Sequence, residues 1–135
     1  NPVGATEVLR TLALEPGEHD LLLVLNDEIA DGRDVSWIWD ADFELLAGRI
    51  ARATCSGSRA PEMALRLKYA GVDPARLTTE RDLRRALALA CADGPGRAGA
   101  PVYALPTYTA MRSLTKLVGA AGGGPLARRL AGWAR

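Results

Sequence analysis

Leu21-Leu22-Leu23-Val24-Leu25 decides the fold of this chain, because the run is continuously apolar and shows no alternation. A strand with one face in solvent alternates apolar and polar residues, whereas a parallel strand covered by helices on both faces is apolar throughout. The run therefore predicts a central strand of a parallel sheet. The acid-rich loop that follows it, residues 26–34, is then expected at the carboxyl edge of the sheet, where ligands bind.

The segments around this run alternate between helical and strand patterns, which is typical of an α/β fold. The patterns predict strands at 35–40, 49–54 and 102–105, and helices at 5–14, 43–47, 61–70, 80–92 and from Thr107 or Thr109 onward. Asp42 is expected to cap the helix at 43–47, and Thr79 with Asp82 to form the capping box of the helix at 80–92. We expect one Rossmann-like domain over residues 1–118, with a mostly parallel sheet sandwiched by helices. A glycine-rich linker and a basic tail follow over residues 119–135.

The composition is that of an ordinary globular domain, with 135 residues, a net charge of +1 and 48% hydrophobic residues. This charge balance gives no electrostatic case for binding nucleic acid. Cys55 and Cys91 lack the spacing of zinc or redox sites, so we interpret them as reduced, mostly buried thiols. No membrane-spanning run or signal peptide is visible. Because the sequence starts at Asn1 on a helix-start pattern, without an initiator methionine, we expect it to be a piece of a longer polypeptide.

Six carboxylates lie between residues 27 and 42, and oxygen ligands of this type could hold magnesium. We favour a solvated loop for Asp27, Glu28 and Asp31. Asp34 and Asp40 differ because they bracket two tryptophans, and a carboxylate beside an aromatic surface can grip an imidazole or a cation. From the residues alone, capping or loop structure and catalysis both stay open for Asp40.

The loop Ser56-Gly57-Ser58-Arg59 lies between a predicted strand and a predicted helix. It could hold an anion through backbone N–H groups and the arginine. It matches neither the phosphate-binding loop nor the dinucleotide fingerprint, so we interpret it as a plain turn. The single histidine, His19, is expected in a surface loop at the opposite edge. No Ser-His-Asp or Cys-His-Asp set can therefore be completed within this chain, and any triad must take its nucleophile and histidine from elsewhere.

Several runs resemble one known family. The most specific is Asp31-Gly32-Arg33-Asp34-Val35-Ser36-Trp37-Ile38-Trp39-Asp40, and residues 1–4, 25–27, 56–60, 63–71 and 105–111 also match. Together they are similar to the C-terminal domain of MurT, the Mur-ligase-like subunit of lipid II isoglutaminyl synthase, over residues 1–118. The resemblance implies the fold of a Mur ligase C-terminal domain. It also implies a two-subunit amidotransferase that uses ATP to amidate the α-carboxyl of D-glutamate in the lipid II stem peptide.

In that family a GatD-type glutaminase partner releases ammonia from glutamine and supplies a cysteine and a histidine, while the ligase subunit supplies the acid of the triad. Matched to the motif, Asp40 is our first choice for the acid and Asp34 the second. Trp37, Trp39 and Arg59 are predicted to contact the partner, although at least one tryptophan could instead pack against a helix.

The resemblance assigns ATP, magnesium and the zinc-ribbon cysteines to the full-length subunit, in the domain before this one. It implies no metal site here, a cytoplasmic enzyme at the inner face of the membrane, and a fragment that is inactive alone. Two other readings stay open: a stand-alone nucleotide- or anion-binding module, and a docking domain whose carboxylates are only structural.

Overall fold

The computed structural model describes residues 1–121, and in this part of the chain four parallel strands form one sheet. The strands lie in the order β3-β2-β1-β4. They comprise β1 (His19–Val24), β2 (Ile50–Ser56), β3 (Leu77–Thr79) and β4 (Val102–Pro106). The apolar run of residues 21–25 falls on β1, which pairs with β2 on one side and with β4 on the other. The predicted central strand and the parallel α/β fold are confirmed.

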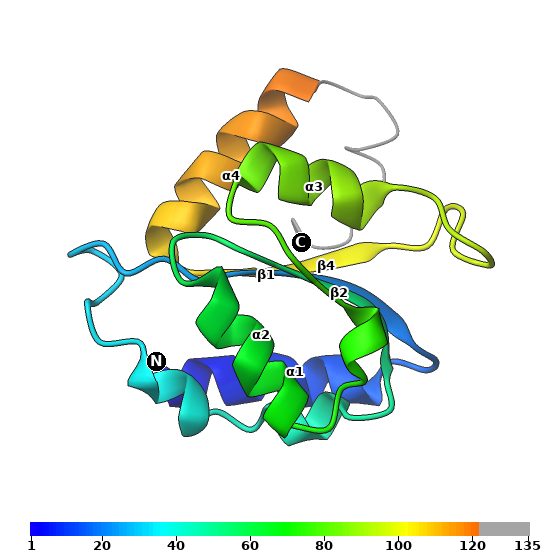
Figure 1. The fold of residues 1–135 in the computed structure, drawn as a ribbon, viewed down its shortest axis with the longest axis horizontal. Coiled ribbons are helices and arrows are strands. Elements are labelled where there is room, and N and C mark those ends of the chain that lie inside the picture. Colours follow the sequence, from blue (N-terminus) through cyan, green and yellow to red (C-terminus); the bar gives the residue numbers. More distant parts are fainter. Residues whose placement is uncertain (122–135) are drawn as a thin grey trace.

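Successive residues of β1 point to opposite faces of the sheet and fill two separate cores. Leu21 and Leu23 belong to the core under α1 (Pro2–Leu14) and α2 (Ala60–Tyr69). Leu22 and Val24 belong to the core under α3 (Leu83–Cys91) and α4 (Tyr108–Ala121). Figure 1 shows these two helix pairs as layers on either side of the sheet. Burial on both faces is the reason that the run carries no polar residue.

The strand predicted at residues 35–40, after the acidic loop, is wrong. This segment forms two short 3₁₀ helices, η1 (Ser36–Trp39) and η2 (Phe43–Leu46), drawn in cyan to turquoise on the side of the sheet where α1 and α2 lie. Val35, Ile38 and Ala41 are buried and lie three residues apart, which is the period of a 3₁₀ helix. The alternation of the tryptophans is therefore not that of a strand. Asp42 precedes η2, but its side chain makes no cap hydrogen bond.

The capping box expected at Thr79 and Asp82 is also wrong. Thr79 is the last residue of β3, a three-residue strand that sequence patterns did not indicate, and it pairs with Cys55. Asp82 alone caps α3, because its carboxylate accepts a hydrogen bond from the backbone N–H of Arg85 at 3.0 Å. A short connector, η3 (Pro74–Arg76), precedes β3.

Two further predictions concern His19 and the glycine-rich linker. His19 is the first residue of β1 and is buried, with Nε2 3.1 Å from the carbonyl oxygen of Leu12, so the predicted surface-loop position is wrong. Helix α4 runs through Gly119 to Ala121, three residues into the predicted linker. The rest of that linker and the basic tail, residues 122–135, lie outside the described residues. Within residues 1–121 no helix is both long and apolar enough to cross a membrane.

Candidate functional site

The loops after β1, β2 and β4 meet at the carboxyl edge of the sheet, and Asn26 connects them. Its side-chain amide donates to Thr109 Oγ1 at 3.0 Å, and its backbone N–H donates to Thr107 Oγ1 at 3.1 Å. Its Oδ1 accepts a hydrogen bond from the backbone N–H of Ser58 at 3.1 Å. The acidic loop and the Ser56–Arg59 loop therefore lie side by side, because parallel strands end at the same edge of the sheet.

The Ser56–Arg59 loop is engaged with acids of the same chain rather than open to an anion. Ser58 Oγ donates to Asp27 Oδ1 at 3.0 Å, and the Arg59 guanidinium bonds both Asp27 at 3.2 Å and Glu62 at 2.9 Å. Hydrogen bonds from Ser58 and Arg59 lower the pKa of Asp27, and the bonds to Glu62 and then Asp27 raise the pKa of Arg59. These contacts support the interpretation as a plain turn held by ion pairs.

Asp31 has a structural role that the sequence did not indicate. Its carboxylate accepts hydrogen bonds from the backbone N–H and the hydroxyl of Thr109, at 2.7 and 2.6 Å, and from the backbone N–H of Glu28 at 3.2 Å. The carboxylate therefore ties the acidic loop to the first turn of α4. This is an internal anchor, where a solvated loop residue was expected.

Asp34 lies in an exposed turn and is already hydrogen-bonded within it. Its Oδ1 accepts from the backbone N–H of Ser36 at 2.8 Å, and hydrogen bonds from the Ser36 backbone and hydroxyl lower the pKa of Asp34. Asp34 shares a small surface pocket of about 270 Å³ with Trp39, Arg59 and Glu62. The structure thus brings together three of the five predicted site residues.

Asp40 lies at the end of η1, on the surface, outside that pocket. Its backbone N–H donates to the carbonyl oxygen of Trp37 at 3.0 Å, which closes the 3₁₀ turn. Within residues 1–121 its carboxylate accepts no hydrogen bond and forms no ion pair. Unlike Asp27, Asp31 and Asp34, it presents an exposed carboxylate that no neighbour in this part of the chain engages.

The two tryptophans differ in their surroundings. Trp39 is 47% exposed and meets Tyr69, which is 72% exposed, edge to face at 5.7 Å. The pair forms an aromatic surface beside Asp40. Trp37 is half-buried and packs against the core under α1 and α2. The packing alternative considered for one of the tryptophans therefore applies to Trp37.

A buried arginine, missed by sequence reasoning, holds the segment that carries Asp40. Arg66 on α2 is only 5% exposed, and its guanidinium donates to the carbonyl oxygens of Ile38 and Ala41, each at 2.7 Å. It also forms an ion pair with Glu44. The signal available in the sequence is its place on the face of a helix that otherwise buries apolar residues.

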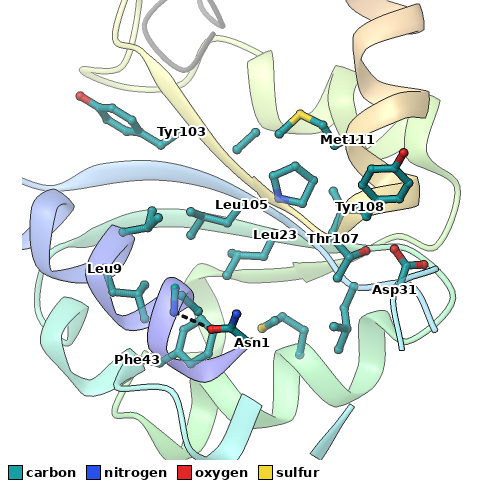
Figure 2. A pocket seen from close by; sticks show the side chains of 18 of the residues that line it. Asn1, Leu9, Leu23, Asp31, Phe43, Tyr103, Leu105, Thr107, Tyr108 and Met111 are labelled. Atoms are coloured by element: carbon teal, nitrogen blue, oxygen red, sulfur yellow. Dashed lines mark hydrogen bonds between the residues drawn. The ribbon is translucent and has the colours of Figure 1, made fainter. Parts of the chain in front are cut away.

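An apolar groove of about 760 Å³ runs between α1 and the edge strand β4. Figure 2 shows Leu9, Leu23, Leu105 and Phe43 around it, with polar groups such as Asp31 where α4 begins. The wall of the groove also includes Trp37. The spacing between a helix and a strand edge is not encoded locally, so no sequence pattern indicated this groove.

The acidic residues of the described part do not gather as metal ligands. Within residues 1–121, no group of three or more His, Cys, Asp or Glu side chains has an arrangement that could hold a metal ion. Cys55 is buried, and burial raises the pKa of its thiol to about 12, so it is not a nucleophile near neutral pH. The chemistry available to this surface is that of an exposed carboxylate beside aromatic side chains.

Comparisons with known proteins agree on one family. The family model described as MurT ligase C-terminal matches residues 1–111. A Streptococcus pneumoniae protein named lipid II isoglutaminyl synthase (glutamine-hydrolyzing) subunit MurT is 37% identical over 119 residues, covering 87% of this chain and 26% of that protein. The protein of the same name from Staphylococcus aureus strain COL is 40% identical over 112 residues, covering 82% of this chain and 24% of that protein. The chain thus spans about a quarter of the length of these relatives.

Proposed function

The chain belongs to the MurT ligase C-terminal family, and we propose that it is the C-terminal domain of the ligase subunit of a lipid II isoglutaminyl synthase. The relatives are named as glutamine-hydrolysing synthase subunits, which implies for them a second subunit. The proposed reaction is the amidation of the α-carboxyl of D-glutamate in the lipid II stem peptide, at the cytoplasmic face of the membrane. A GatD-type glutaminase supplies the ammonia. ATP and magnesium activate the carboxyl group in the part of the subunit outside this chain.

The domain's own part in this reaction is to dock the glutaminase and to complete its catalytic triad with Asp40. The observation that carries this proposal is the exposed Asp40 carboxylate, which no group in residues 1–121 engages. The chain's one histidine, His19, is buried at the start of β1 and cannot partner it. An acid without a nearby base in its own chain fits a site whose cysteine and histidine belong to another subunit.

In such a site the cysteine gives its proton to the histidine, and the thiolate attacks the amide carbon of glutamine. Ammonia leaves with that proton, and water then releases glutamate from the thioester. Asp40 accepts a hydrogen bond from the other imidazole nitrogen, which orients the ring and stabilises it when it is protonated. Asp34 is the second choice, because one of its oxygens is already committed to the backbone of Ser36.

Docking is assigned to the surface around Asp40. Trp39 is the best-placed anchor, because large, partly exposed aromatic side chains supply much of the energy of protein interfaces. Arg59 lies in the pocket beside it and is held by Asp27 and Glu62. Trp37, which is half-buried against the core, lines the groove next to α1 and is the weaker candidate for an anchor. A domain that only docks the partner, with structural carboxylates, is the alternative that the following experiment addresses.

The test is Asp40→Asn in the complete two-subunit enzyme, assayed with glutamine and with free ammonia. Asparagine keeps the size but cannot stabilise a protonated histidine, so glutamine-driven amidation should fall by up to about four orders of magnitude, as for the acid of a serine-protease triad. The ammonia-driven reaction should be largely spared, because carboxyl activation happens elsewhere. Complexes must be shown to stay assembled, for example by size-exclusion chromatography.

Asp42→Asn is the matched control, since Asp42 is an exposed aspartate two residues further along and should tolerate the change. Asp34→Asn separates the two candidates: if it alone abolishes glutamine hydrolysis, the triad role moves to Asp34. If Asp40→Asn and Asp34→Asn both hydrolyse glutamine normally within an assembled complex, the domain is a docking module and the shared triad is wrong.

A further inference from the structure

We propose that Arg66 is the positioning residue for Asp40, an inference that rests on the proposed triad role of Asp40. Arg66 lies on α2 and does not approach solvent, so it is not a catalytic group itself. Its guanidinium reaches across to the segment between η1 and η2. The two backbone carbonyls that it binds belong to Ile38 and Ala41, on either side of Asp40.

The hydrogen bonds of Arg66 fix the backbone on both sides of the acid. Nε donates to the Ile38 carbonyl and Nη2 to the Ala41 carbonyl, both at 2.7 Å, so one rigid planar group spans the turn. Charge-assisted hydrogen bonds of this length are about twice as strong as neutral ones. A lysine has a single flexible ammonium and cannot reproduce this fork.

The same guanidinium also sets the aromatic surface beside the acid. It lies 5.4 Å from the centroid of the Trp39 ring and 5.3 Å from that of Phe43, within cation–π range of both. Trp39 in turn contacts Tyr69 edge to face. One buried side chain therefore organises both the proposed triad acid and the proposed docking anchor.

The charge of Arg66 is balanced by Glu44 and not by Asp40. Glu44 on η2 accepts a hydrogen bond from Nη2 of Arg66 at 2.9 Å through Oε2, and this ion pair links α2 to η2. A second tether comes from α1, where Thr6 Oγ1 accepts the backbone N–H of Asp42 at 3.1 Å. The segment is thus held from two helices, while the Asp40 carboxylate is left available to a histidine of the partner.

Positioning matters here because a triad acid works only at hydrogen-bond distance from the imidazole. A displacement of about 1 Å can cost about 10²-fold in rate. Arg66→Met keeps the aliphatic stem of the side chain and removes the fork. In the assembled two-subunit enzyme we expect this variant to lower glutamine-driven kcat by about 10- to 100-fold. The KM for glutamine and the ammonia-driven rate should change little, since neither depends on the triad acid.

Arg66→Lys is the second variant, and it keeps the positive charge should Arg66→Met fail to fold. It is expected to show the same pattern with a smaller loss. Arg52→Met is the matched control, because Arg52 likewise binds two backbone carbonyls and an acid, Asp20, but at the other edge of the sheet. It should leave the ratio of glutamine-driven to ammonia-driven activity unchanged.

A double-mutant comparison separates positioning from a general structural effect. If Arg66 acts through Asp40, then Arg66→Met adds little to the loss already caused by Asp40→Asn. Losses that multiply, or an equal fall of the glutamine-driven and ammonia-driven rates, would overturn the positioning role and leave the triad proposal standing. A fully active Asp40→Asn enzyme would instead overturn the proposed function, and the positioning role with it.

Discussion

At Gly57 the loop after β2 lies directly against the backbone at the end of β1. The φ of Gly57, +92°, lies in a region that residues with a side chain rarely adopt. A Cβ atom at this position would lie 2.5 Å from the carbonyl oxygen of Leu25 and 2.6 Å from Oδ1 of Asn26. Glycine is therefore required twice over, by its backbone conformation and by the space available.

We predict that Gly57→Ala destabilises the chain more than Gly32→Ala, although both glycines have a φ of +92°. At Gly32 nothing lies within 4 Å of an added Cβ, so only the backbone conformation is penalised, by about 1–2 kcal/mol. At Gly57 the overpacking should add a further 1–3 kcal/mol or so. Urea unfolding of the unsubstituted chain and of the two variants measures the difference in the free energy of unfolding. Equal losses for the two variants would contradict the close approach.

The elements of this fold owe their form to how many of their faces are covered. Strand β1 is buried along its whole length because helices cover both faces of the sheet and strands flank both edges. The η1–η2 segment, in contrast, is covered on one side only, where it packs against the core under α1 and α2. Its buried residues, Ile38 and Phe43 among them, point inward while Trp39 stays partly exposed.

We predict that Leu22→Ala and Leu23→Ala each lower the free energy of unfolding by about 2–5 kcal/mol. The two side chains point to opposite faces of β1, and both are fully buried, in separate cores. Leu14→Ala is the control, because Leu14 is 81% exposed and its loss should change stability by less than about 0.5 kcal/mol. Denaturant titration tests this directly. A mild effect at either Leu22 or Leu23 would mean that one face of the strand is not covered.

On the scale of the whole molecule, the two ends of the strands differ: ion pairs hold the end where the strands begin, and the candidate site lies at the end where they stop. At the edge where the strands begin, the buried Asp20 carboxylate pairs with Arg52 at 3.2 Å and Arg97 at 3.1 Å. These pairs lock β1 to β2 and to the loop before β4. At the edge where the strands end, the loops after β1, β2 and β4 meet at Asn26. The loop after β1 then continues into the η1–η2 segment, which carries Asp40.

We predict that this chain alone does not bind ATP in the micromolar range. It has no phosphate-binding loop. Its Ser58 and Arg59 donors, the best candidates for a phosphate, are already engaged by Asn26, Asp27 and Glu62. Titration calorimetry of the isolated chain should give no saturable heat, whereas the full-length subunit should bind. Micromolar affinity for the isolated chain would support a stand-alone nucleotide module instead.

Local sequence determined most of the α/β framework. The apolar run at 21–25 specifies a strand covered on both faces, and Pro61 and Gly71 mark the start and end of α2, because these signals act over a few residues. The acids Asp34 and Asp40 could also be singled out from their places beside the tryptophans. The triad role proposed for one of these acids comes from the resemblance to the MurT family and not from local sequence patterns.

Tertiary structure decided what depends on neighbours distant in the chain. The tryptophan segment has the alternation of a strand, but it packs against α1 and α2 instead of lying beside a strand of the sheet, and its i, i+3 burial gives a 3₁₀ helix. Likewise His19 is buried because α1 and Tyr103 of β4, both distant in the chain, pack against the start of β1. The hydrogen bonds of Arg66 follow from the packing of α2 against η1, which brings residues 25 and 28 positions apart within hydrogen-bond distance. Local patterns cannot encode such contacts, because the energy that selects them comes from packing between elements and not from the residues of any one element.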